Sequence, residues 1–487
     1  MGYKQEHEAF VSDNPGTTVI HIALTGIACL LPVYIRDVCC VAVPVLKKFK
    51  DNLWLNYLID FITVIIPLQF FMSSFAQYYI QCFVSGLLIF IVIFSIKLQN
   101  SKIKSVYSDT AFSSVEMGSR RPFINYYRAY ANVITAFSIL AVDFKIFPRY
   151  FAKVETYGTG LMDVGVGGFL ISNAVVSPEA RKINSPDRAW VSILKSVKSS
   201  MPLIVIGLIR VLAVKSADYQ EHVTEYGVHW NFFFTLATVK IACTVLFCAI
   251  SPKMWKVAGV LIIAAYQHNL MYDGLRNYLI KGYDGKGGRT DIIDANREGL
   301  YSCFGFLSIY IMGIQLGNLV MKKREKVKDW ILLCISLSLV STGCWILLYC
   351  SEKYVEPISR RFANLSYLLW MLAFNSMLLT VFLLFDIIVF YLHYVTTVSQ
   401  LKESPKNDKK EDTSVSNQDT CDLISAVNYN GLFYFLFANL LTGSVNMLVK
   451  TIYQSDLVAM AILTTYMFIL SAVTYILYKR KLSLKFW

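Results

Sequence analysis

Long apolar stretches alternate with short polar ones along almost the whole chain. Crossing the hydrocarbon core of a bilayer takes roughly 20 apolar residues of helix, and most of the stretches approach that length. Backbone groups inside lipid must bond within their own segment, so each stretch is predicted to be a helix. The pattern predicts about thirteen spanning helices, at residues 18–34, 52–72, 75–96, 130–147, 161–177, 202–214, 230–250, 257–272, 300–320, 330–350, 362–395, 430–450 and 458–478.

These segments indicate an all-α, polytopic integral membrane protein, with residues 1–487 forming one membrane-embedded domain. Lys and Arg gather in a subset of the short loops, and such loops normally face the cytosol. Thirteen spans then place the N-terminus on the opposite side and the C-terminus in the cytosol. The polar segment 396–428 also falls in the cytosol, and its composition predicts disorder.

Composition decides between two interpretations of a basic chain. The net charge of +13 is compatible with nucleic-acid binding, but 55% of the residues are hydrophobic and only 16% are charged. The basic residues lie between apolar segments, and no soluble basic module is present to bind a nucleic acid. The 11 cysteines are scattered without metal-ligand spacing, so we predict neither a metal site nor a disulfide framework.

The densest group of chemically capable residues follows the fourth apolar segment. Asp143 lies at its end, still flanked by Val142 and Phe144, and a carboxylate at that depth is a functional candidate by default. Pro148 stops the helix. Beyond it, the i, i+4 spacing predicts a helical interfacial segment that carries Arg149 and Lys153 on one face and folds back towards Asp143.

Two interpretations of this group remain open. A carboxylate near a lysine at a lipid–water boundary suits proton transfer from a hydroxyl, with the cations binding phosphate or stabilising an oxyanion. An ion pair that closes a helical hairpin, with Lys153 snorkelling, would use the same residues. Spacing alone does not separate the two.

Further candidates lie in other loops and spans. The glycine-rich run 158–168 is expected mainly to permit close helix packing, with Asp163 as a polar contact. The loop 273–299 has five basic residues on the non-cytosolic side, which suggests an anionic ligand unless its own acidic residues balance them. His268 lies in an apolar helix and is expected to be a hydrogen-bonded core residue, with a catalytic base as the alternative. The remaining candidate contacts are Arg276, Asn296 and Arg297 in or beside this loop, and Asn439 and Asn446 on one face of a late span.

Three stretches resemble the GPI inositol acyltransferase family, called PIG-W in animals and Gwt in yeasts. They are LAVDFKIFPRYFAKVETYGTGLMDVGVGGF (140–169), ANREGLYSCFGF (295–306) and ANLLTGSVN (438–446), and EAFVSDNPGTTVIHI (8–22) is also similar. Where the family pattern reads DFPxFPRRFAK, this chain has Lys145 for proline and Tyr150 for the second arginine. Any role that needs paired arginines therefore does not carry over.

The resemblance implies transfer of a fatty acyl chain, usually palmitoyl, from acyl-CoA to the inositol 2-hydroxyl of glucosaminyl-phosphatidylinositol in the endoplasmic reticulum membrane. Acyl-CoA is a co-substrate, and no other cofactor is implied. Asp143 would be the base for the hydroxyl or its orienter, and Lys153 would stabilise the thioester oxyanion or set the charge of Asp143. Arg149 and the basic residues of 276–297 would face lipid or CoA phosphates.

A secondary transporter is the alternative. In a proton-coupled transporter of a small or lipid-like solute, the intramembrane acids would form a proton path. The residues concerned would be Asp60, Asp143 and Asp386.

Overall fold

The computed structural model describes residues 3–42, 52–100, 109–118, 121–182, 188–216, 223–403 and 421–484. Across these ranges every regular element is a helix, and the one strand-type contact is an isolated bridge between Glu116 and Lys326. The all-α prediction is confirmed for this part of the chain.

The helices fall into two groups. Short helices and turns lie mainly near the ends of long ones: α1 (Tyr3–Val11), α4 (Leu53–Asp60), η2 (Phe61–Ile65), α5 (Ile66–Phe71), η3 (Ala76–Tyr78), α7 (Asp109–Ser114), η4 (Arg149–Phe151), η5 (Leu161–Asp163), α11 (Val223–Tyr226), η6 (Pro252–Met254), α14 (Leu275–Lys281), α15 (Ile292–Ala295), α19 (Asp422–Tyr429) and η7 (Thr451–Tyr453). The longer helices are α2 (Val19–Ala42), α6 (Tyr79–Asn100), α8 (Pro122–Ala141), α9 (Val164–Val175), α10 (Ala189–Ser216), α12 (Phe232–Ala249), α13 (Trp255–Met271), α16 (Arg297–Val320), α17 (Val327–Tyr354), α18 (Leu365–Glu403), α20 (Gly431–Leu448) and α21 (Asp456–Lys479).

All thirteen predicted segments contain helix, but the count of thirteen spans is not confirmed. Within the described ranges, ten helical segments are long and apolar enough to cross a membrane. The other three predicted spans correspond to α8, α9 and α13. α9 has only 12 residues and α13 has 17, while the first half of α8 carries polar residues (NYYRAYAN). The segment 362–395 forms one helix, α18, of 39 residues, and not a tight pair.

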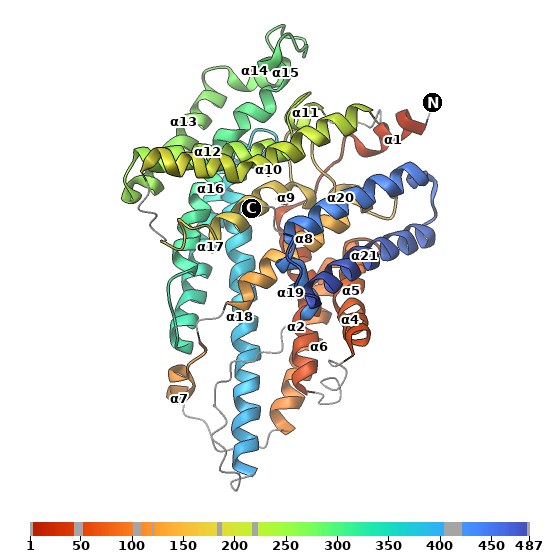
Figure 1. Ribbon diagram of the computed structural model, residues 1–487, viewed down its shortest axis with the longest axis vertical. Coiled ribbons are helices and arrows are strands. Elements are labelled where there is room, and N and C mark those ends of the chain that lie inside the picture. The colour runs from red at the N-terminus through yellow and green to blue at the C-terminus, as the bar shows by residue number, and fades with distance from the viewer. Residues whose placement is uncertain are drawn as a thin grey trace.

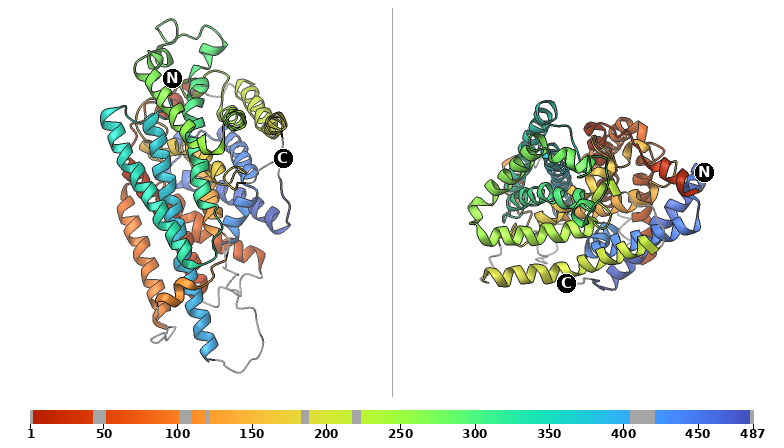
Figure 2. Two further views of the ribbon diagram at one scale, coloured as in Figure 1. Left: turned by 90° about the vertical axis from the view of Figure 1, so that its left-hand side faces the viewer. Right: turned by 90° about the horizontal axis from the view of Figure 1, so that it is seen from above.

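The long helices pack in pairs. α17 lies along α18, α2 along α6, and α10 along α12. Figures 1 and 2 show α17 and α18 running lengthwise through the molecule, while α10 and α12 run side by side across its upper part. α8 and α9 are internal: α8 packs on α18, α19, α20 and α21, and α9 packs on α16 and α18. The segment that joins α8 to α9 therefore starts and ends inside the helix packing.

Contacts between loops sort them into two sides. The Thr17 amide donates to the carbonyl oxygen of Thr159 (2.7 Å), and the Gly158 amide donates to that of Ile358 (2.9 Å). The N-terminal segment, the loop after α8 and the loop between α17 and α18 thus share one side, as the orientation argument requires. At the other side the Met117 amide donates to the Glu325 carbonyl oxygen (2.8 Å).

The structure has helix at both ends of the segment 396–428, which the composition predicts to be disordered. α18 continues to Glu403, and α19 begins at Asp422. Residues 404–420, where that prediction mainly falls, lie outside the described residues.

Candidate functional site

The segment from Asp143 to Asp163 is a folded loop and not a second helix. α8 ends at Ala141, and beyond Pro148 there is only one 3-10 turn, η4, before Ala152 takes an extended conformation (φ −65°, ψ 169°). The prediction that Arg149 and Lys153 share a helical face is therefore wrong. The i, i+4 argument failed because it assumed a helix that this sequence does not continue.

Asp163 fixes the far end of this loop. Its Oδ2 accepts hydrogen bonds from the backbone amides of Val154 (3.2 Å) and Gly160 (2.7 Å), and its Oδ1 accepts one from Arg360 Nε (2.7 Å). The side chain is completely buried. Asp163 therefore holds the loop in its observed conformation. A direct contact between Asp163 and a substrate remains a prediction.

Asp143 lies between the two ends of the chain. Its Oδ1 is 3.3 Å from Nε2 of His7 on α1, and its Oδ2 accepts a hydrogen bond of 2.7 Å from Nδ2 of Asn446 on α20. Only 5% of Asp143 is exposed. Two predicted site residues, Asp143 and Asn446, are thus brought together, and sequence reasoning missed His7.

Arg149 lies over the same turn. Its Nη2 donates to the carbonyl oxygens of Val142 (2.6 Å) and Phe147 (3.2 Å), and its guanidinium carbon is 4.2 Å from the ring centre of Phe10. Burial lowers the pKa of Arg149 to about 10, although the charge of Asp143 opposes that shift. Backbone carbonyl oxygens of the loop therefore accept hydrogen bonds from most of the Arg149 N–H groups that were predicted to bind phosphate.

Lys153 belongs to a chain of four alternating charges. Its Nζ lies 2.9 Å from both carboxylate oxygens of Glu225 on α11. Arg360 Nη1 donates to Glu225 Oε1 (3.0 Å) and Arg360 Nε to Asp163 (2.7 Å). Burial alone would raise the pKa of Glu225, but the charges of Lys153 and Arg360 outweigh it and lower that pKa to about 2. We call Lys153, Glu225, Arg360 and Asp163 the ion chain.

The structure does not bring Asp143 and Lys153 into contact. Among the described side chains Asp143 pairs with His7 and Asn446, while Lys153 pairs with Glu225. The two positions are linked instead by the N-terminal segment, because Asn14 Nδ2 donates to the Lys153 carbonyl oxygen (3.2 Å).

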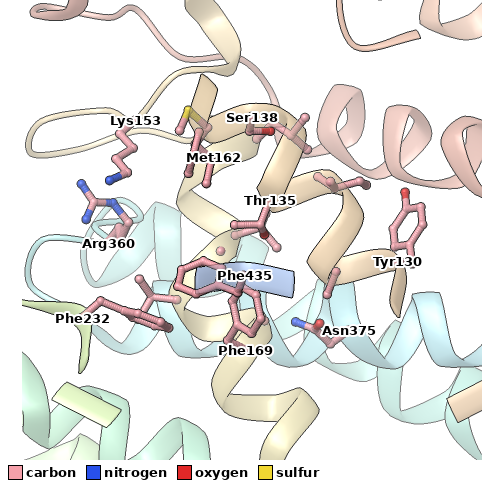
Figure 3. A pocket seen from close by; sticks show the side chains of 18 of the residues that line it. Tyr130, Thr135, Ser138, Lys153, Met162, Phe169, Phe232, Arg360, Asn375 and Phe435 are labelled. Atoms are coloured by element: carbon pink, nitrogen blue, oxygen red, sulfur yellow. The ribbon is translucent and has the colours of Figure 1, made fainter. Parts of the chain in front are cut away.

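A cavity of about 170 Å³ opens beside the ion chain. Figure 3 shows Lys153 and Arg360 at one end of it and the rings of Phe169, Phe232 and Phe435 along its wall. Its other walls come mainly from α8, from η5 and from α9, with a smaller part from α18, and Asn439 also lines it. Asp143 lies outside this lining. The cavity therefore joins a charged end to an apolar interior, a combination that suits a ligand with an anionic head and a hydrocarbon chain.

The other predicted residues form a separate group. His268 is exposed on α13 and lies against Tyr272, with ring centres 5.0 Å apart. Asn296 Oδ1 accepts hydrogen bonds from the backbone amides of His229 (2.8 Å) and Trp230 (2.9 Å). None of the predicted residues in or beside the loop 273–299 lines the cavity, and their roles in substrate binding remain predictions.

The basic residues of that loop are largely balanced by acids. Arg297 pairs with Asp294 (3.0 Å), and Arg289 with Glu298 (2.9 Å). Arg276 lies 3.6 Å from Glu356, and hydrogen bonding to Tyr157 is the main cause that raises the pKa of Arg276. Ion pairs within the protein therefore account for most of this positive charge, which was the alternative to an anionic ligand.

Two residues of the ion chain escaped sequence reasoning. Glu225 lies in a short loop between spans, and Arg360 is half of an Arg-Arg pair on the side that the orientation rule leaves poor in cations. That departure was the available signal. The transporter path is not assembled: Asp60 pairs with Arg36 (2.8 Å) and Asp386 accepts from Tyr34 (3.2 Å), and neither contacts Asp143.

Comparison with known proteins matches this chain along almost its whole length. A family model described as GWT1 matches residues 3–477. The chain is 36% identical to the glucosaminyl-phosphatidylinositol-acyltransferase PIGW of Bos taurus and 34% identical to that of Homo sapiens, over 100% of both chains in each case. It is 32% identical to GPI-anchored wall transfer protein 1 of Candida albicans over 99% of each chain.

Proposed function

The chain belongs to the GWT1 family, and from that premise we propose that it is an acyltransferase acting on glucosaminyl-phosphatidylinositol in GPI-anchor biosynthesis. The acyl donor is acyl-CoA, with palmitoyl as the usual chain, and the acceptor is the inositol 2-hydroxyl. The enzyme works in the endoplasmic reticulum membrane, with its N-terminus in the lumen and its C-terminus in the cytosol.

The observation that carries the proposal is the cavity with its charged end. The apolar stretch lined by Phe169, Phe232 and Phe435 suits a fatty acyl chain, and in this proposal the polar part of the donor lies at the ion chain. Lys153 has 40% of its side chain exposed, so its ammonium group is accessible at that end.

The reaction requires one proton to move and one bond to exchange. The inositol oxygen attacks the thioester carbonyl carbon, and its proton passes to Asp143 or to a group that Asp143 orients. The ammonium of Lys153 stabilises the oxyanion that forms on the carbonyl oxygen. The carbon–sulfur bond then breaks, and the CoA thiolate leaves and takes up the proton. α1 helps to hold both positions, through His7 at Asp143 and through the hydrogen bond from the following Asn14 to the backbone of Lys153.

The direct test is to incubate the purified full-length protein in lipid nanodiscs with glucosaminyl-phosphatidylinositol and labelled palmitoyl-CoA. Label on the inositol ring is the expected result. D143N and K153A should each abolish transfer while the protein still accumulates in membranes. K145A is the matched control, because Lys145 lies in the same loop with an exposed side chain.

Two results would count against the proposal. Retained activity in both D143N and K153A would remove the assigned roles. Solute flux across proteoliposomes without consumption of acyl-CoA would instead indicate the transporter.

A further inference from the structure

Three cations meet at the charged end of the cavity. Lys153, Arg360 and Arg210 all line it, and so does the single carboxylate of Glu225. Arg210 lies near the end of α10 and is close enough to Glu225 for its charge to act on that carboxylate. With Asp163 behind Arg360, the group has three positive and two negative charges.

The three cations differ in what they bind. Arg360 is buried and donates to both Glu225 and Asp163, and Lys153 holds both oxygens of Glu225. Arg210 is exposed to the cavity and makes no hydrogen bond or ion pair with any other residue that the structure describes. Within the described ranges it is therefore the one cation of this group whose donors have no partner in the protein.

We propose that Arg210 binds a phosphate group of a substrate. A guanidinium offers a planar fork of N–H donors that matches two phosphate oxygens, and it keeps its charge at every physiological pH. Its place beside the apolar wall sets the order of contacts along the ligand, with phosphate at Arg210 and hydrocarbon along the phenylalanines. The inference rests on the proposed function, because both substrates of that reaction carry phosphate.

The phosphate group at Arg210 can belong to either substrate, and kinetic measurements distinguish the two. One is the phosphate groups of acyl-CoA, and the other is the phosphodiester of glucosaminyl-phosphatidylinositol. KM is measured for palmitoyl-CoA at saturating lipid, and for a short-chain glucosaminyl-phosphatidylinositol at saturating palmitoyl-CoA. R210Q is expected to raise one of these two KM values about tenfold or more, with kcat within about threefold of the wild type.

Two further variants complete the test. K198Q removes an exposed cation from the same helix, away from the cavity lining, and both of its KM values should equal those of the wild type. R210K keeps the charge without the planar fork and should raise the same KM by a smaller factor. It also carries the test if R210Q does not accumulate.

The outcomes are distinct. A rise in the KM for palmitoyl-CoA assigns Arg210 to the CoA phosphates, and a rise in the KM for the lipid assigns it to the phosphodiester. Unchanged values for both substrates overturn the inference, as does a fall in kcat alone. A wild-type protein without acyl transfer would overturn the proposed function instead.

Discussion

At the scale of single residues, Glu225 does the most to organise the charged end of the cavity. It touches Lys153 and Arg360 together, and through Arg360 it is joined to the carboxylate that shapes the loop after α8. Removing one member of such a buried group leaves its partners charged and unpaired, which costs more than the pair itself contributes.

E225Q should therefore lower kcat about 10- to 100-fold, because Lys153 loses the group that fixes its position relative to the thioester. E225D, which keeps the charge one methylene further back, should recover part of the loss. E155Q is the control, because Glu155 is an exposed acid of the same loop. Wild-type kcat in E225Q would contradict the positioning role.

The stability of the protein should depend on pH through the same carboxylate. Burial raises the pKa of Glu225, but Lys153 and Arg360 lower it further, so it falls from 4.5 to about 2 on folding. Because the pKa is lower in the folded protein, the ionised carboxylate stabilises the fold by its full amount above about pH 4.5. That contribution is lost as the pH falls towards 2. In detergent, the difference in Tm between wild type and E225Q should be largest above about pH 5 and shrink below it. A constant difference between pH 6 and pH 3 would refute this.

At the scale of elements, the loop between α8 and α9 depends on close backbone contacts. Gly160 packs so tightly that an added Cβ would overlap the carbonyl oxygen of Ala152. Gly167 faces α18, where a Cβ would overlap Met371. The packing interpretation of this glycine-rich run is thus confirmed at Gly167, while Gly160 closes the loop that Asp163 fixes.

G160A should therefore abolish acyl transfer, because the clash is with backbone and cannot be relieved by a side-chain rotation. The protein should still insert into membranes, since insertion depends on the hydropathy of each spanning segment. G343A is the control, because a Cβ at that helical position meets no atom within 4 Å. Equal activity of G160A and G343A would show that the loop tolerates rearrangement.

The N-terminal helix α1 is the second element on which the site depends. It brings His7 to Asp143, and Tyr3 near its start is 3.2 Å from Thr451 Oγ1. H7A should lower acyl transfer about tenfold, because Asp143 loses one of the two side-chain partners that the described ranges give it. Q5A, an exposed position of the same helix, should have no effect. Acyl transfer per membrane-embedded protein is the measurement. Equal values for the two variants would show that α1 does not contribute to the site.

At the scale of the whole molecule, α8 and α9 lie among the long apolar helices and position the site. Of those long helices, α2 and α18 are themselves mostly buried, while α6, α10 and α20 are mostly exposed. α9 and much of α8 are buried among α16, α18 and α20. α9 is too short to cross a membrane, and α8 is long enough but not apolar enough. Loops from both halves of the chain converge where α8 ends. The arrangement allows residues far apart in sequence to share one cavity.

The orientation of this assembly is open to test. In sealed microsomes, a tag at the N-terminus should be protected from protease and a tag at the C-terminus should be cut. A cysteine placed at Glu155 should be labelled by a membrane-impermeant reagent only after the microsomes are opened. Labelling of that cysteine in sealed microsomes would invert the topology.

The amino-acid sequence determined the helical elements, the membrane character and the segment that carries Asp143 and Lys153. Each of these follows from properties local to a stretch of chain, namely hydropathy over one span and a run of unusual residues. The extended path after Pro148, the pairing of Asp143 with His7 and Asn446, and the ion chain through Glu225 and Arg360 were decided only by tertiary structure. Those contacts join residues separated by up to about 300 positions, and no periodicity along a chain records which of its polar loops will meet.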